Sequence, residues 1–231
     1  MATGNQGHAL VWRGTAESVV DVHPVGFEQS LAYATDGFQQ VGSAAGPSTG
    51  GYFHAFLWGG TAASAIDLNP AGFTFSEAHG ISASQQVGYG YGVATGSILH
   101  ALLWSGTAES FVDLNPTGFA TSTALGINGS QVVGYGFVSL TEINEHALLW
   151  RGTAASAIDL HQFLPPEFVR SEAMAINSQG DVVGFARSAS ELSHAVLWRA
   201  VPEPATFGLL AAGLGALLAY GLRRRRKSQG G

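Results

Sequence analysis

The chain has 231 residues and a formal net charge of −6, and 46% of its residues are hydrophobic while only 11% are charged. Charged residues make up about a quarter of an ordinary soluble domain, so few side chains are available for acid or base catalysis. Cysteine is absent, which excludes disulfides and thiolate metal sites. Residues 1–200 carry fifteen acidic and five basic side chains, a charge balance that argues against nucleic acids and anionic polymers as ligands.

Residues 1–200 are built from a repeated unit. The motif His-Ala-x-x-Trp begins at residues 8, 54, 100, 146 and 194, so consecutive copies are 46, 46, 46 and 48 residues apart. Its fixed positions are His8, Trp12, His54, Trp58, His100, Trp104, His146, Trp150, His194 and Trp198. A constant period of this length indicates a repeat architecture, and we interpret residues 1–200 as one repeat domain.

Each unit predicts four short strands. Gln131–Tyr135 is β-branched and aromatic, Asn128-Gly129 suits the turn of a hairpin, and no segment before residue 200 keeps a helical period. Four strands in about 46 residues are typical of one propeller blade. The sequence therefore predicts an all-β, propeller-like domain, followed by one C-terminal transmembrane helix.

The strand count favours four blades of four strands. Three blades are continuous in the sequence, and the fourth would close the ring by pairing the strand near Asp21 with the last three strands. In this arrangement the strand at His8 belongs to none of the four blades. A five-bladed ring or an open array is the second arrangement, and parallel ladders would indicate a solenoid instead.

In amino-acid sequence, the units resemble the HAF repeats of bacterial extracellular proteins. These repeats are named for a His-Ala-Phe start like that of His54-Ala55-Phe56. The resemblance covers residues 8–200. The family has no established activity, so the resemblance implies an extracellular repeat protein and names no ligand.

The histidines follow the repeat. Five of the eight occupy one repeat position, which favours a shared structural role, such as a hydrogen bond from the imidazole to a neighbouring strand. The departures are His23 and His161, where other units carry Asn69 and Asn115, and His79. These three are expected in turns and lack the spacing of metal ligands, so no metal or cofactor site is predicted.

The carboxylates show no catalytic pattern. Asp67 and Asp113 precede Leu-Asn-Pro, whereas a calcium loop needs oxygen ligands at several alternate positions, so an Asx-type turn at a strand end explains them. Glu77 and Glu172 follow the repeated Ser in two of the units. They are the candidates if the chain is a glycosidase or lyase, but the prediction is a protein without catalytic residues.

The last thirty or so residues differ from the repeats. The motif Val201, Pro202, Glu203, Pro204 is followed by an uncharged segment, 205–222, and then by the cations Arg223, Arg224, Arg225, Arg226 and Lys227. A helix of this length spans roughly 27 Å, close to the hydrocarbon core of a bilayer, so residues 205–222 predict a transmembrane helix. The cations favour the cytoplasmic side, which places residues 1–200 outside the cytoplasm.

This order of segments resembles the PEP-CTERM sorting signal of Gram-negative bacteria over residues 201–227. The resemblance implies recognition by an exosortase, a membrane protease and transpeptidase, and an association with exopolysaccharide and biofilm systems. Two prolines withhold backbone donors and favour an extended segment, so residues 201–204 are the expected processing site. Such segments are also named ice-binding protein C-terminal domains, but ice binding requires a regularly spaced Thr-rich face, for which the repeats are too poor in threonine.

We therefore expect an exported protein that is held at the inner membrane and then sorted to the cell surface, acting as a non-enzymatic binding or extracellular-matrix component. The expected partners are exosortase, the membrane through residues 205–222, and extracellular polysaccharide, with no nucleic acid. An exported chain should begin with a signal peptide, yet Met1–Gly7 has neither charge nor a hydrophobic run. We expect either a misassigned start or missing upstream sequence.

Overall fold

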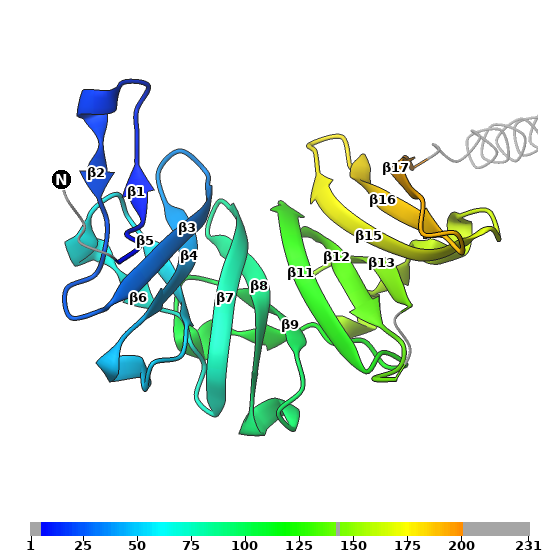
Figure 1. Cartoon of the computed structure of the whole chain (residues 1–231), viewed down its shortest axis with the longest axis horizontal. Helices are drawn as coiled ribbons and strands as arrows, with labels where there is room; N and C mark the ends of the chain where they lie inside the picture. Colours follow the sequence, from blue (N-terminus) through cyan, green and yellow to red (C-terminus); the bar gives the residue numbers. More distant parts are fainter. Residues whose placement is uncertain (1–5, 142–143, 201–231) are drawn as a thin grey trace, which may run out of the picture. The chain divides into compact units, whose positions relative to one another are not determined.

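The computed structural model describes residues 6–141 and 144–200, and the predicted sorting segment lies outside them. The described chain is mostly β, with five antiparallel sheets and only short 3-10 turns (Figure 1). Residues up to Arg199 form one compact unit. The all-β prediction for the repeats is therefore confirmed.

The sheets follow the chain. The first contains β1 (Leu10–Val11) and β2 (Val20–Asp21), and the second contains β3 (Gln29–Thr35), β4 (Gln40–Ala45), β5 (His54–Trp58) and β6 (Ile66–Asp67). The third contains β7 (Phe73–Ser82), β8 (Gln85–Gly92), β9 (His100–Trp104) and β10 (Val112–Asp113). The fourth contains β11 (Thr121–Asn128), β12 (Gln131–Phe137), β13 (Glu145–Trp150) and β14 (Ile158–Asp159). The fifth contains β15 (Phe168–Ile176), β16 (Val182–Ser188) and β17 (Ser193–Trp198).

Short 3-10 turns connect these strands. They are η1 (Ala16–Ser18), η2 (Pro47–Thr49), η3 (Ala62–Ser64), η4 (Val93–Thr95), η5 (Ala108–Ser110), η6 (Ala154–Ser156) and η7 (His161–Phe163). In the turn between β9 and β10, the Ser110 hydroxyl donates to the Thr107 carbonyl at 2.6 Å and accepts from the Ser105 amide at 2.8 Å. A side chain thus satisfies backbone groups that so short a helix leaves unpaired.

A glycine in the second strand of each complete sheet permits close pairing with the first. Gly134 on β12 pairs with Ala124 on β11, where the register of β11 shifts. A Cβ on Gly134 would lie 1.9 Å from the carbonyl oxygen of Thr123. No side chain fits there, so the close approach of the two backbones requires glycine at this position.

Consecutive sheets pack face to face through apolar clusters. Leu102 and Trp104 of β9 pack with Val41, Ala55 and Leu57 of the preceding sheet, and the same arrangement recurs at the next interface. Trp58, Trp104 and Trp150 are completely buried. A buried tryptophan removes about 150–250 Å² from water, which corresponds to roughly 4–6 kcal/mol of gross hydrophobic free energy. The repeated tryptophan is therefore the main apolar residue of each interface.

The pairing predicted to close the ring is wrong. The strand near Asp21 is β2, which pairs with β1 in the register Leu10 to Asp21, matching Phe56 to Asp67 in the next unit. A hairpin within one unit has a lower loop-closure entropy cost than pairing across the whole domain. The described residues therefore form no closed ring, and the fifth sheet has three strands. Antiparallel ladders throughout also argue against a parallel-stranded solenoid.

Within residues 6–141 and 144–200, no helix is long and apolar enough to cross a bilayer. The predicted transmembrane helix at 205–222, the motif at 201–204 and the cations at 223–227 lie outside the described residues.

Candidate functional site

The repeated histidine links two strands within each sheet. The His100 Nδ1 donates to the Asp113 Oδ2 at 2.7 Å, and the Asp113 Oδ1 accepts from the Asn115 amide at 2.8 Å, forming an Asx turn. The corresponding pairs are His8 with Asp21, His54 with Asp67, and His146 with Asp159, each at 2.8 Å. These histidines and aspartates thus complete the turns that end the strands. His194 is the second residue of β17, whose sheet has no fourth strand among the described residues.

A second polar network links consecutive sheets. The Ser76 hydroxyl on β7 accepts from the Ala55 amide on β5 at 2.9 Å and donates to the Asn69 Oδ1 at 2.7 Å. The Asn69 amide group then donates to the Phe73 carbonyl at 3.0 Å. Ser76 is fully buried, so this bond satisfies a strand amide that would otherwise be unpaired inside the interface.

His23 takes the place of the asparagine in this network. Its Nε2 donates to the Phe27 carbonyl at 3.1 Å, so its Nδ1 accepts from the Ser30 hydroxyl at 2.8 Å. The ring stacks on His8 with centroids 3.8 Å apart. His161 likewise bonds to a serine through Nδ1, and burial lowers the pKa of its imidazole. The described residues contain no group of three or more His, Cys, Asp or Glu arranged to hold a metal.

Glu77 is the centre of a polar cluster that breaks the repeat symmetry. Its Oε2 accepts from the Tyr89 hydroxyl on β8 at 2.7 Å and from the His79 Nε2 at 3.1 Å. Its Oε1 accepts from Tyr33 on β3 at 3.3 Å and from Ser43 on β4 at 3.4 Å. We call these five residues the Glu77 cluster. It joins the first two strands of the second sheet to those of the third.

Aromatic rings extend from this cluster along the strands. His79 lies between Tyr33 and Tyr89, with centroid distances of 4.4 and 5.0 Å and nearly parallel rings. Phe75 stacks on Tyr89 at 6.1 Å and on Tyr91 at 5.2 Å. These five rings, which we call the aromatic row, are all partly or well exposed. They form a continuous row of nearly parallel rings beside one carboxylate, and His79 is covered on both faces by its neighbours.

The hydrogen bonds keep Glu77 ionised. Burial opposes the charge, but the bonds from His79 and Tyr89 outweigh it and lower the pKa of the Glu77 carboxyl. Burial and the adjacent Glu77 charge raise the pKa of the Tyr89 hydroxyl. A carboxylate that accepts several hydrogen bonds is a poor general acid. The four bonds to Glu77 also use the acceptor sites of its two oxygens.

Glu172 occupies the same repeat position as Glu77 in a different environment. Burial and the nearby Glu145 charge raise the pKa of the Glu172 carboxyl, and Arg187 partly offsets this increase. Glu145 is only 4% exposed, and its Oε2 has no hydrogen-bond partner among the described residues. Glu77 and Glu172 therefore belong to separate clusters, and no described contact joins them as a catalytic pair.

The sequence named Glu77 as a candidate carboxylate and His79 as a departure from the repeat but did not bring them together, and it gave no role to Tyr33, Ser43 and Tyr89. It placed His79 in a turn, whereas His79 lies on β7. Pairing of β7 with β8 places Glu77 opposite Tyr89. That contact follows from hairpin register alone, and a register alignment would have found it. The contacts to the second sheet depend on the packing of one sheet on another.

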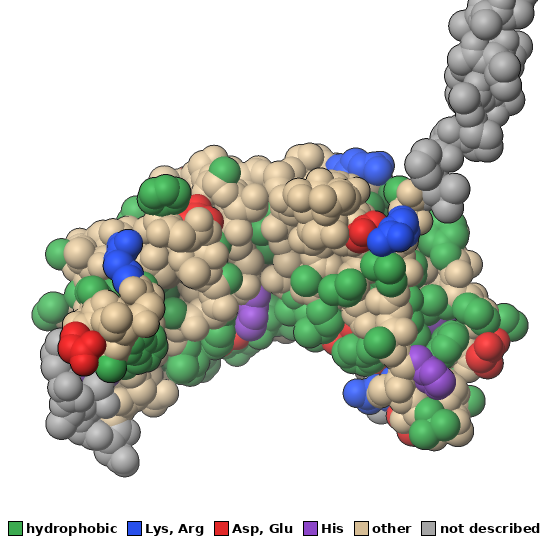
Figure 2. All heavy atoms as spheres, turned by 90° about the horizontal axis from the view of Figure 1, so that it is seen from above, with side chains coloured by type: hydrophobic (Ala, Val, Ile, Leu, Met, Phe, Trp, Pro, Cys, Tyr) green, Lys and Arg blue, Asp and Glu red, His purple; other side chains and the backbone are tan. Residues whose placement is uncertain are grey.

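Figure 2 shows charged side chains as isolated groups on a surface of apolar and neutral polar atoms.

Comparison with known families concerns the C-terminal segment. Residues 200–226 match the PEP-CTERM protein-sorting motif. The match includes Val201–Pro204, residues 205–222 and the four arginines, and it supports exosortase-dependent sorting of this chain to the cell surface. No curated protein matches the chain.

Proposed function

We propose that the chain is a surface-sorted binding protein whose repeat domain takes a neutral extracellular polysaccharide on the aromatic row, without catalysing a reaction. The observation that carries this proposal is the stacked set of rings beside an ionised carboxylate. Sugar rings present C–H faces that pack on aromatic rings, and the bonds from Tyr33, His79 and Tyr89 to the Glu77 carboxylate hold three of these rings in place. The acidic composition of residues 1–200 disfavours an anionic polymer.

In this proposal the sheets are blades of a propeller-like array of HAF-type repeats. Residues 205–222 hold the protein in the inner membrane as a transmembrane helix, with residues 1–200 outside the cytoplasm. Exosortase then acts at residues 201–204, and the repeat domain becomes part of the surface or biofilm matrix. The match at residues 200–226 supports the processing step.

Binding is tested by applying the full chain, purified in detergent, to an array of neutral and anionic glycans. Replacing both Tyr33 and Tyr89 by alanine removes two rings of the row and should weaken binding to a neutral glycan more than tenfold. Tyr52→Ala is the matched control, because Tyr52 is an exposed tyrosine outside the row. Equal binding by the double variant and the wild type, or binding only to anionic glycans, would contradict the proposal.

Sorting is tested separately in an exosortase-positive host. Deletion of Pro202, Glu203 and Pro204 should keep the protein in the membrane fraction, whereas the intact chain should reach the surface or medium. The same fractionation for both forms would refute processing at this motif. A glycan that binds the purified chain would leave that refutation unchanged, so the two claims can fail independently.

A carbohydrate-active enzyme is the second candidate, favoured by the raised pKa of Glu172 beside Glu145. A carboxyl group with a raised pKa suits a general acid in glycoside cleavage. If any glycan is hydrolysed, Glu172→Gln should lower turnover by at least a hundredfold. Unchanged turnover in Glu172→Gln and in Glu77→Gln would exclude both candidates.

A further inference from the structure

The fifth sheet exposes a face that the three four-stranded sheets bury. Val183 on β16 is 47% exposed and Leu197 on β17 is 51% exposed. Their counterparts in the preceding sheet, Val133 and Leu149, are 0% and 7% exposed. Ala195, two residues before Leu197 on β17, is also exposed, whereas its counterpart Ala147 is fully buried. The fifth sheet thus presents the apolar residues that normally receive the following repeat.

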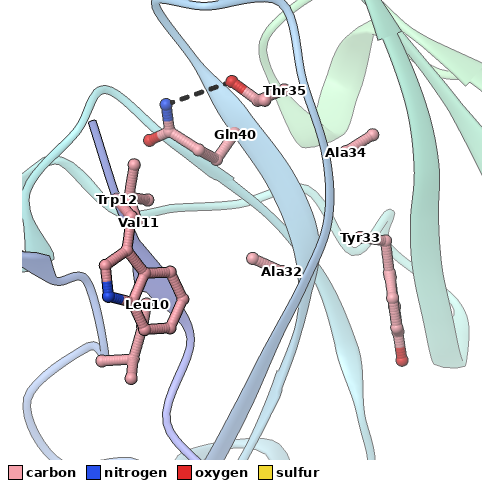
Figure 3. A pocket seen from close by; sticks show the side chains of 8 residues that line it. All are labelled: Leu10, Val11, Trp12, Ala32, Tyr33, Ala34, Thr35 and Gln40. Atoms are coloured by element: carbon pink, nitrogen blue, oxygen red, sulfur yellow. Dashed lines mark hydrogen bonds between the residues drawn. The ribbon is translucent and has the colours of Figure 1, made fainter. Parts of the chain in front are cut away.

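The first sheet exposes the opposite half of the same interface. Trp12, next to β1, is 55% exposed, whereas the equivalent Trp104 is completely buried. Figure 3 shows Trp12 and Leu10 beside the groove formed with β3, which has a volume of about 310 Å³. In the four-stranded sheets, the strand equivalent to β1 also pairs with the second strand of its sheet, as β9 pairs with β8. The first sheet has no strand in that place among the described residues.

The internal interfaces show how these two faces fit together. In the cluster between the third and fourth sheets, Leu148 and Trp150 pack with Val87, Ala101 and Leu103. Leu10 and Trp12 correspond to the first pair, and Val183, Ala195 and Leu197 correspond to the second set. The first and fifth sheets therefore carry residues equivalent to opposite sides of an interface that the chain already forms between its own repeats, although the described part of the first sheet has no counterpart of Ala124 and Val132.

We propose that the fifth sheet of one copy receives Leu10 and Trp12 of a second copy, so that the protein assembles head to tail. A second copy fits because it carries the residues that fill this face inside the chain. Such a contact is heterologous, and it produces an open filament or a ring of several copies. It is weaker than the internal interfaces, because the first sheet has only two strands among the described residues. Assembly should therefore depend on concentration.

The absence of cysteine permits a direct test on the full chain in detergent. The double variant Trp12→Cys/Val183→Cys should, on mild oxidation, give a ladder of covalent species in multiples of 23.9 kDa on a non-reducing gel. The ladder should fade on dilution. The matched control is Phe38→Cys/Val183→Cys, because Phe38 is 83% exposed at a hairpin outside both faces, and it should give at least tenfold less ladder.

Three other outcomes would overturn the proposal. A cross-linked single chain with altered mobility would show that one copy closes on itself. A dimer from Trp12→Cys or Val183→Cys alone, as strong as the ladder, would show contact between like faces. No cross-link above the control would show that the faces do not meet. Adding Leu197→Asp to the double variant should reduce the ladder roughly tenfold, because an unpaired carboxylate resists burial, and an unchanged ladder would also contradict the proposal.

Discussion

Trp104 and Trp12 occupy the same repeat position at opposite extremes of burial, so their replacement tests the packing of the sheets. Trp104 is 0% exposed in a cluster shared by the second and third sheets, and Trp12 is 55% exposed. Trp104→Ala should lower the free energy of unfolding by about 3–5 kcal/mol, from lost transfer free energy and the cavity left behind. Trp12→Ala should cost about 2 kcal/mol or less, because less than half of its surface is buried.

The assay is urea unfolding of the full chain in detergent, followed by far-ultraviolet circular dichroism. With a denaturant dependence of about 2 kcal/mol per molar urea, a loss of 4 kcal/mol moves the midpoint down by roughly 2 M. Because the stability of repeat arrays depends on contacts between neighbouring units, the first transition is the one to compare. The protein should be dilute, so that assembly does not add to the stability of the wild type.

A midpoint for Trp12→Ala as low as that for Trp104→Ala would refute this reasoning. It would mean that the first sheet packs as tightly as the internal ones, and that Trp12 has a partner in the isolated chain. A fall of less than 0.5 M for Trp104→Ala, about 1 kcal/mol at this slope, would instead show that the shared cluster contributes little to stability.

Gly134→Ala should cost about 3 kcal/mol, because its Cβ would lie 1.9 Å from the Thr123 carbonyl oxygen, whereas Gly7→Ala, in open space, should leave the urea midpoint unchanged. Equal midpoints for the two variants would contradict the close-pairing argument. The lowered pKa of Glu77 gives stability that is present above its ordinary value of 4.5 and lost as pH falls through the folded-state pKa, so Glu77→Gln should reduce the acid-side loss of stability. The raised pKa of Glu172 gives stability that is present below 4.5 and lost as pH rises through its folded-state pKa, so Glu172→Gln should reduce that loss. Urea midpoints measured from pH 3 to 8 check both signs. If Glu77→Gln and Glu172→Gln changed the pH dependence of the midpoint in the same direction, the two opposite signs would be contradicted.

The period of the sequence was sufficient to predict the strands, because each unit carries its own turns. The bond between His100 and Asp113 lies within one unit, so a local pattern encodes it. Ring closure could not be predicted in this way, because a count of strands does not show which of two possible partners a strand pairs with. The strand near Asp21 could pair with β1 or with β17 on composition alone, and the shorter loop to β1 decides the pairing.

The Glu77 cluster could not be predicted from the sequence for a related reason. Tyr33 and Glu77 are 44 residues apart and bond across two sheets, so their contact depends on how far one sheet is offset on the next. Repeats of nearly equal length bring equivalent positions of adjacent units close together. Tyr33 and His79 hold the same position in consecutive units, and their rings stack at 4.4 Å.

This closeness of equivalent positions explains where the aromatic row ends. In the next unit the position of His79 is taken by Leu125, whose carbonyl oxygen lies 2.9 Å from a Cβ built on Gly80, so the backbones of β7 and β11 remain close there. Leucine offers no flat face for stacking, and the aromatic row is therefore confined to the second and third sheets. A ligand that follows the row is expected to contact two repeats, whereas the His–Asp bonds recur in units with and without the row.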